Sequence, residues 1–190
     1  IVENIYFTAA LSANRAPELL SIENDRFSDI PELPGTRAYS TRYNIWRKEC
    51  QAVIVYTESF FAKQLHGVTQ NLVKSQEKLA DLKHRLSKDH SRGKKPEIKN
   101  LKKQIQKIFS VQFMGDLLNV KIQDKGALPD FTYALDHSAL RNLSNQRLGK
   151  TVLVTDQLDW PPHQVIESYR NLTYIEESFK NMKNVDFLRW

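Results

Sequence analysis

The feature that most constrains the fold is a long apolar seam with a helical period. Apolar side chains recur at steps of three, four and seven along one segment: Leu65, Val68, Leu72, Leu79, Leu82 and Leu86. After the break "HSRGKKP" (residues 90–96), a second set follows at threes and fours: Ile98, Leu101, Ile105 and Ile108. This spacing lines up each set along one side of an α-helix. It predicts two helices in an antiparallel hairpin that buries both seams.

Strand patterns flank this hairpin on both sides. Residues 4–11 ("NIYFTAAL") predict one strand, and residues 37–57 alternate in a way that predicts two antiparallel strands joined near Tyr43–Asn44. Residues 120–126 and 131–140 predict a second β region, and "GKTVLVTD" (residues 149–156) predicts a buried strand. We also expect a short helix within residues 12–22 and a turn at residues 31–36. After "WPP" a last helix begins, because Pro suits a first turn.

The two ends of the chain therefore look α/β, and the middle looks like an insertion. We expect a core built from residues 1–30 and 149–190. The insertion, residues 31–148, would hold antiparallel strands and the long helical hairpin. A chain of 190 residues is long enough for one domain of this kind.

The charge of the chain favours an anionic partner. The formal net charge is +6, and residues 83–107 contain ten basic residues against only Asp89 and Glu97. The excess is therefore concentrated at the tip of the predicted hairpin, where a DNA-contacting arm would include Lys88, Arg92, Lys94, Lys95 and Lys99. Such an arm would bind phosphates in a salt-dependent manner. A solvated loop and helix face explains the same charges, and both interpretations remain open.

Several classes of protein are excluded or disfavoured. The single cysteine, Cys50, rules out an internal disulfide, and we interpret it as a structural residue. The longest apolar run, "AVIVY" (residues 52–56), is far shorter than the roughly 18 residues of a membrane span, so we expect no membrane partner. The five histidines have no metal-ligand spacing, and no P-loop, HExxH, GxSxG or paired CxxC motif occurs.

The last helix carries charged residues on the side that it should bury. Its stripe runs through Val165, Tyr169, Leu172 and Phe179, and Glu176 lies on the same stripe. Beside the strand "TVLVT", this stripe would direct Glu176 at the end or edge of a sheet. A carboxylate there is costly unless Lys183, an arginine or a divalent cation compensates it. A partly exposed salt bridge at the edge is the alternative.

The segment "YRNLTYIEESFKNMK" resembles the C-terminal signature of DDE insertion-sequence transposases. In that family a tyrosine, a glutamate and a lysine stand seven residues apart, and Tyr169, Glu176 and Lys183 match these positions. The arginine often found three residues after the tyrosine is replaced by Leu172, whereas Arg170 is basic but lies on another face. Residues 148–170 resemble the strand and helix start before this glutamate. Residues 38–64 resemble strands that open an insertion in one branch of the family.

The resemblance implies a ribonuclease H-like catalytic domain that carries out metal-dependent cleavage and strand transfer at transposon ends. Three carboxylates would hold two Mg²⁺ (or Mn²⁺) ions, with Glu176 as the third. Tyr169, Lys183 and Arg170 would position DNA. The partners implied are double-stranded transposon ends and target DNA, within a homodimeric synaptic complex. The resemblance also implies a prokaryotic cytoplasmic protein that acts at the nucleoid.

The two aspartates of the family lie upstream of the insertion, and "NIYFTAAL" corresponds to a strand after the second of them. We therefore expect this chain to be a fragment that is inactive alone. Asp156 ends a strand, and we favour a turn or capping role for it. The alternative function is a non-catalytic basic coiled-coil module that binds nucleic acid or a partner helix. A different nuclease on the same scaffold is a third possibility.

Overall fold

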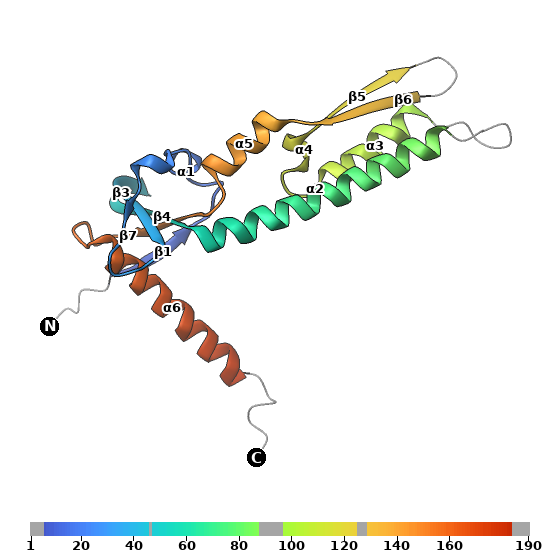
Figure 1. Cartoon of the computed structure of the whole chain (residues 1–190). Coiled ribbons are helices and arrows are strands. Elements are labelled where there is room, and N and C mark those ends of the chain that lie inside the picture. Colours follow the sequence, from blue (N-terminus) through green and yellow to red (C-terminus); the bar gives the residue numbers. More distant parts are fainter. Residues whose placement is uncertain (1–5, 46, 88–96, 125–128, 184–190) are drawn as a thin grey trace. The chain divides into compact units, whose positions relative to one another are not determined.

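The computed structural model describes residues 6–45, 47–87, 97–124 and 129–183 (Figure 1). The chain divides into two compact units, one made of residues 1–61 and 145–190 and the other of residues 62–144. This division differs from the predicted boundaries at residues 30 and 148. The reason is that the strands of residues 36–57 pair in the same sheet as the strand at residues 150–155.

The first unit contains a five-stranded antiparallel sheet in the order β1-β7-β4-β3-β2. Its strands are β1 (Thr8–Leu11), β2 (Ser28–Asp29), β3 (Thr36–Ile45), β4 (Lys48–Thr57) and β7 (Lys150–Thr155). The central register pairs Gln51 with Thr155 and Tyr56 with Lys150. A mixed α/β fold is thereby confirmed, since the helices α1 (Pro17–Leu20) and α6 (Pro162–Lys183) pack on this sheet.

Both faces of the sheet are covered near its centre. On one face, alternate residues of β4 and β7, such as Ile54 and Val152, pack against Leu19 and Leu20 of α1. On the other face, Val53 and Leu153 belong to a core cluster that includes Val165 and Ile166 of α6. Burial on two sides explains why "AVIVY" and "TVLVT" are nearly continuous apolar runs.

The β3–β4 hairpin turns later than the sequence predicts. β3 continues through Tyr43 and Asn44 to Ile45, which pairs with Lys48. The predicted junction at Tyr43–Asn44 is therefore wrong, although the two antiparallel strands are confirmed. Arg47 adopts the left-handed conformation, with φ 66°. This conformation is typical of glycine and asparagine, so an arginine does not mark the turn in the sequence.

The second unit is built around two helices. α2 (Glu58–Ser87) enters it from the first unit, and α3 (Ile98–Phe109) lies beside α2 in antiparallel orientation (Figure 1). The predicted seams are buried: Leu79, Leu82 and Leu86 on α2, and Leu101, Ile105 and Ile108 on α3. Leu65 and Leu72 are only half-buried. The helical hairpin is thus confirmed, apart from residues 88–96, which lie outside the described residues.

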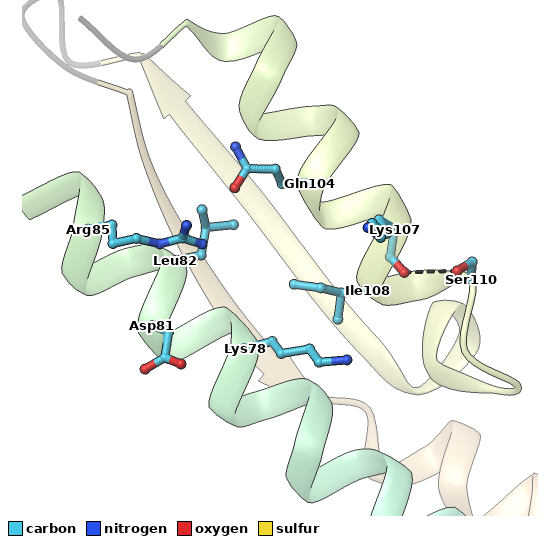
Figure 2. A pocket seen from close by; sticks show the side chains of 8 residues that line it. All are labelled: Lys78, Asp81, Leu82, Arg85, Gln104, Lys107, Ile108 and Ser110. Carbon is cyan, nitrogen blue, oxygen red and sulfur yellow. Dashed lines mark hydrogen bonds between the residues drawn. The ribbon is translucent and has the colours of Figure 1, made fainter. Parts of the chain in front are cut away.

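A β-hairpin completes this unit. The short helix α4 (Met114–Leu117) leads into β5 (Leu118–Asp124), which pairs antiparallel with β6 (Pro129–Leu135), and this hairpin runs along α2 and α3 (Figures 1 and 2). The predicted β region is confirmed only up to Leu135. Residues 137–146 form α5 (His137–Gln146) instead, because the carboxylate of Asp136 accepts the N–H of Ala139 at 2.9 Å and caps that helix. Among the helices described, none has the length and apolar character needed to cross a membrane.

Candidate functional site

The first half of α6 is fixed firmly to the sheet. Val165 and Ile166 are 0% and 2% exposed, and Tyr169 packs against the same cluster. Two polar contacts hold this part of the chain in place: Gln51 Nε2 donates to the carbonyl of Trp160 at 2.9 Å, and the hydroxyls of Thr8 and Ser168 lie 3.2 Å apart. The start of the candidate signature, Tyr169, is therefore positioned by β1, β4 and β7.

A small cavity lies where α6 leaves the sheet. Its volume is about 210 Å³, and it is lined by residues of β4, β7, α2 and α6: Val55, Thr57, Phe60, Gly149, Thr151, Leu153, Ile166, Tyr169 and Arg170. The lining is mostly apolar, and Arg170 brings the only formal charge to it. The structure thus places Tyr169 and Arg170 at one cavity, as two of the three residues predicted to position DNA.

The predicted burial of Glu176 against the sheet is wrong for this chain. All the side chains described from Arg170 to Lys180 are exposed, Glu176 among them. The stripe itself is present, because Leu172 and Phe179 flank Glu176 on the same side of the helix. However, α6 has passed the packed sheet before Glu176 is reached, so the carboxylate needs no compensation for burial.

The apolar residues around Glu176 are unusually open to solvent. Leu172 is 43% exposed, Ile175 52% and Phe179 56%. Three large apolar side chains so close together on one helix are uncommon on a protein surface unless that surface binds something. Lys183 ends the helix, but its side chain lies outside the described residues.

The described residues bring no cluster of metal ligands together around Glu176. Within residues 6–45, 47–87, 97–124 and 129–183, no group of three or more His, Cys, Asp or Glu side chains could hold a metal ion. Glu176 offers the hard oxygen donor that Mg²⁺ or Mn²⁺ prefers. It offers only one of the three carboxylates that the resemblance implies.

Asp156 has a structural environment. Its carboxylate accepts the backbone N–H of Phe7 at 3.1 Å and forms an ion pair with Lys48 at 3.2 Å. Burial raises the pKa of this carboxyl, but the contacts with Phe7, Lys48 and Gln157 outweigh burial and leave the pKa below its ordinary value. These contacts fasten the chain before β1 to the end of β7, so Asp156 has a structural role through contacts distant in sequence, whereas the sequence predicts a local turn or helix cap.

Cys50 also has a structural environment. It is 1% exposed in β4, and burial raises the pKa of its thiol, which keeps the sulfur protonated and unreactive.

The predicted basic arm falls largely outside the described residues. This holds for Lys88, Arg92, Lys94 and Lys95, which lie within residues 88–96. Lys99 is described, and its side chain is exposed in the first turn of α3. The predicted role of the arm therefore stays a prediction.

A groove that the sequence analysis missed lies between α2 and α3 (Figure 2). Its volume is about 500 Å³, and its lining comes from both helices and the segment after α3: Lys78, Asp81, Leu82, Arg85, Gln104, Lys107, Ile108 and Ser110. Lys78 precedes the basic cluster of residues 83–107 and was not counted with it. Its spacing could have revealed it: Lys78, Asp81 and Arg85 follow one another at steps of three and four residues, so they share one side of the helix beside the apolar seam.

Comparisons of the chain with models of known protein families, with curated proteins and with solved structures found no match.

Proposed function

We propose that this chain is part of the catalytic domain of a DDE transposase with a ribonuclease H-like core, and that it supplies Glu176 as the third carboxylate. One observation carries the proposal. Tyr169, at the first position of the signature, packs on the sheet, and the rest of the stripe continues on a helix that extends past it. Because the tyrosine is fixed to the sheet and the helix is straight, the glutamate seven residues later lies about 10.5 Å further along the helix axis, in a fixed direction.

The exposed apolar residues beside Glu176 support the same proposal. Leu172, Ile175 and Phe179 form a surface that would be covered in the assembled catalytic domain. Under the proposal, the two aspartates come from a part of the protein other than these 190 residues and approach Glu176 over this surface. Covering it would also exclude water from around the carboxylate and strengthen its electrostatic interactions.

Glu176 is the kind of ligand that Mg²⁺ or Mn²⁺ binds, but a site for two ions needs more carboxylates than this one. A carboxylate oxygen suits Mg²⁺ or Mn²⁺, and when bound in such enzymes these ions stabilise charge during phosphoryl transfer. Glu176 would be one ligand. Tyr169 and Arg170, which share one cavity, and Lys183 would contact DNA phosphates, the lysine and arginine through their charge. The proposed partners are transposon ends and target DNA, bound by a homodimer.

The test is a pair of substitutions in the longer protein that this proposal requires. Glu176→Ala should abolish cleavage of transposon ends, whereas Glu177→Ala, an exposed neighbour on another face, should leave it unchanged. Equal cleavage by the Glu176 variant and the unmodified protein would refute the proposal. DNA binding should survive both substitutions, which separates lost chemistry from lost folding.

A non-catalytic module that binds nucleic acid is the second candidate. The observation that favours it is the positive charge on the described parts of α2 and α3, which include Lys78, Arg85, Lys99 and Lys107 as exposed residues. This candidate predicts that Glu176→Ala has no effect on any activity of the protein. The charge itself leads to a separate inference.

A further inference from the structure

The groove between α2 and α3 combines a closed apolar floor with an open charged rim. Leu82 and Ile108 form the floor and are only 3% and 8% exposed. The remaining lining residues are exposed and polar, and they come from α2, from α3 and from Ser110 just after α3 (Figure 2). Because Leu82 and Ile108 are already buried by the protein, most of the apolar surface that the groove offers belongs to the stems of the charged and polar side chains around them.

The rim is positively charged. Lys78 and Arg85 stand on α2, Lys107 stands on α3, and Asp81 is the one acidic residue in the lining. Figure 2 shows the Lys78 side chain extending toward α3 and the Asp81 carboxylate turned away from it. Within the described part of the chain, these four side chains form no ion pair with one another or with other residues. Three cations and one carboxylate therefore line the groove, a net charge of +2, with no ion pair among them.

The arrangement of these charges suits an extended anion better than a single ion. Lys78 and Arg85 are seven residues apart, about 10.5 Å along α2, so they mark two points on a line. Lys107 adds a third point across the groove, and the amide of Gln104 adds a hydrogen-bond donor. A phosphate backbone presents negative charges in series, whereas a free phosphate ion presents one centre.

An acidic amphipathic helix is a less suitable occupant. Helix-in-groove recognition depends on apolar side chains that enter an apolar groove. Here Leu82 and Ile108 are nearly inaccessible and form no pocket for an apolar side chain, whereas the charged ends of Lys78, Arg85 and Lys107 are exposed. Sequence-independent contacts with nucleic acid have this character.

We propose that the α2–α3 groove seats the phosphate backbone of double-stranded DNA, with Lys78, Arg85 and Lys107 as the contacting cations. This inference does not depend on the chemistry proposed for Glu176. It also differs from the predicted arm at residues 88–99, because its cations lie on the facing sides of the two helices, below the hairpin tip.

The test compares two double variants of equal charge. Lys78→Gln with Lys107→Gln removes one cation from each side of the groove. Lys83→Gln with Lys102→Gln also removes one lysine from each helix, but neither residue lines the groove, and Lys83 lies about 140° around the helix from Lys78. All four side chains are exposed, so both variants should keep the thermal unfolding midpoint of the unmodified chain, measured by circular dichroism.

Binding of the 190-residue chain to a fluorescent DNA duplex is measured by anisotropy at several salt concentrations. The groove variant should bind roughly ten-fold or more weakly at 100 mM salt, and its slope of log K against log salt should be shallower by about 1.8. The control variant should change the slope by less than about half as much, since its charges lie farther from the DNA and are screened. Equal effects of the two variants, or no binding of duplex by the unmodified chain, would overturn the inference.

Inorganic phosphate distinguishes a backbone seat from a site for a single anion. At constant ionic strength, millimolar phosphate should not displace the duplex from the unmodified chain. Displacement by phosphate, with no such effect on the groove variant, would show a single-anion site and overturn the proposal. A Glu176→Ala chain should bind duplex as the unmodified chain does, so loss of the proposed catalytic role would leave this result intact.

Discussion

The ammonium of Lys150 donates a hydrogen bond to the backbone carbonyl of Leu20 at 2.9 Å and so joins the first residue of β7 to the last residue of α1. A second hydrogen bond reaches the carbonyl of Ile22 at 2.6 Å, and the ammonium lies 5.3 Å from the centre of the Phe27 ring. Lys150 is only 5% exposed, and burial lowers its pKa to about 8. A charged side chain thus holds a buried junction of the first unit.

The low pKa of Lys150 makes stability depend on pH in the alkaline range. The folded pKa is about 8 and the ordinary value is 10.5, so the unfolded chain holds more protons between these limits. The free energy of unfolding should therefore rise with pH across this window, relative to a Lys150→Met chain, by on the order of 1 kcal/mol. Urea unfolding of both chains at pH 7.5, 9 and 10 measures this difference. A constant difference between them would contradict the assignment.

Gly149 occupies a position that admits no side chain. Its φ is +77°, and a Cβ would lie 2.7 Å from the ring of Tyr56 and 2.8 Å from Cβ of Phe61. Gly149→Ala should lower the free energy of unfolding by about 2–4 kcal/mol, through left-handed backbone strain and the clash. Gly67→Ala is the control, since nothing lies within 4 Å of that Cβ in the middle of α2. It should stabilise the chain by about 0.5–1 kcal/mol, and equal losses from the two substitutions would disprove the packing argument.

The two aspartates after β7 should differ in their contribution to stability. Asp156 has a side chain that is only 13% exposed and bonds Phe7 and Lys48, whereas Asp159 is 97% exposed in a surface pair with Arg42. Asp156→Asn should lower the free energy of unfolding by about 1 kcal/mol at pH 7. Asp159→Asn should change it by less than about 0.5 kcal/mol.

The pH dependence of the Asp156 effect has a defined sign. Because the folded pKa lies below the ordinary value of 3.8, the stabilisation is present above about pH 4 and is lost as the pH falls through the folded pKa. The unmodified chain and the Asp156→Asn chain should therefore converge in stability as the pH falls below the folded pKa of Asp156. A gap that stays constant as the pH is lowered until the chain unfolds would show that the contact does not depend on the charge of the carboxylate.

The purified 190-residue chain should have no Mg²⁺-dependent activity on transposon-end DNA. Glu176 alone does not assemble a site for two metal ions, and the described residues contain no further cluster of ligands. The measurement is a gel assay for strand cleavage with Mg²⁺, with Mn²⁺ and with chelator. Cleavage that chelator abolishes would refute the expectation that the remaining carboxylates lie elsewhere.

Local periodicity predicted the elements of this fold well. The seams around Leu79 and Leu101 are buried as expected, and Pro162 opens α6. These features depend on neighbours a few residues away, so a single sequence contains them. The order of the strands in the sheet depends on distant residues instead. Gln51 pairs with Thr155, about a hundred residues away, and no local pattern indicates that pairing. For this reason the sequence alone places residues 36–57 in an insertion, although their strands pair in the sheet of the first unit.

The candidate site was only partly predictable for a related reason. The spacing of Tyr169 and Glu176 fixes which side of α6 they share, but it does not give the length of the sheet on which the helix packs. Glu176 is consequently exposed, while Tyr169 is packed. Likewise, the positive charge near residue 83 is visible in the sequence, but the groove requires Lys78 of α2 and Lys107 of α3 to line the same hollow, which only the packing of the two helices brings about.

Metal binding is the most direct test of the claim that Glu176 is a ligand of the catalytic ions. In the longer protein that the proposed function requires, bound to transposon-end DNA, Mn²⁺ binding can be followed by electron paramagnetic resonance with Glu176→Gln and Glu177→Gln variants. We predict that Glu176→Gln weakens Mn²⁺ binding at least ten-fold and that Glu177→Gln leaves it unchanged. Mn²⁺ bound equally tightly by all three proteins would contradict the account.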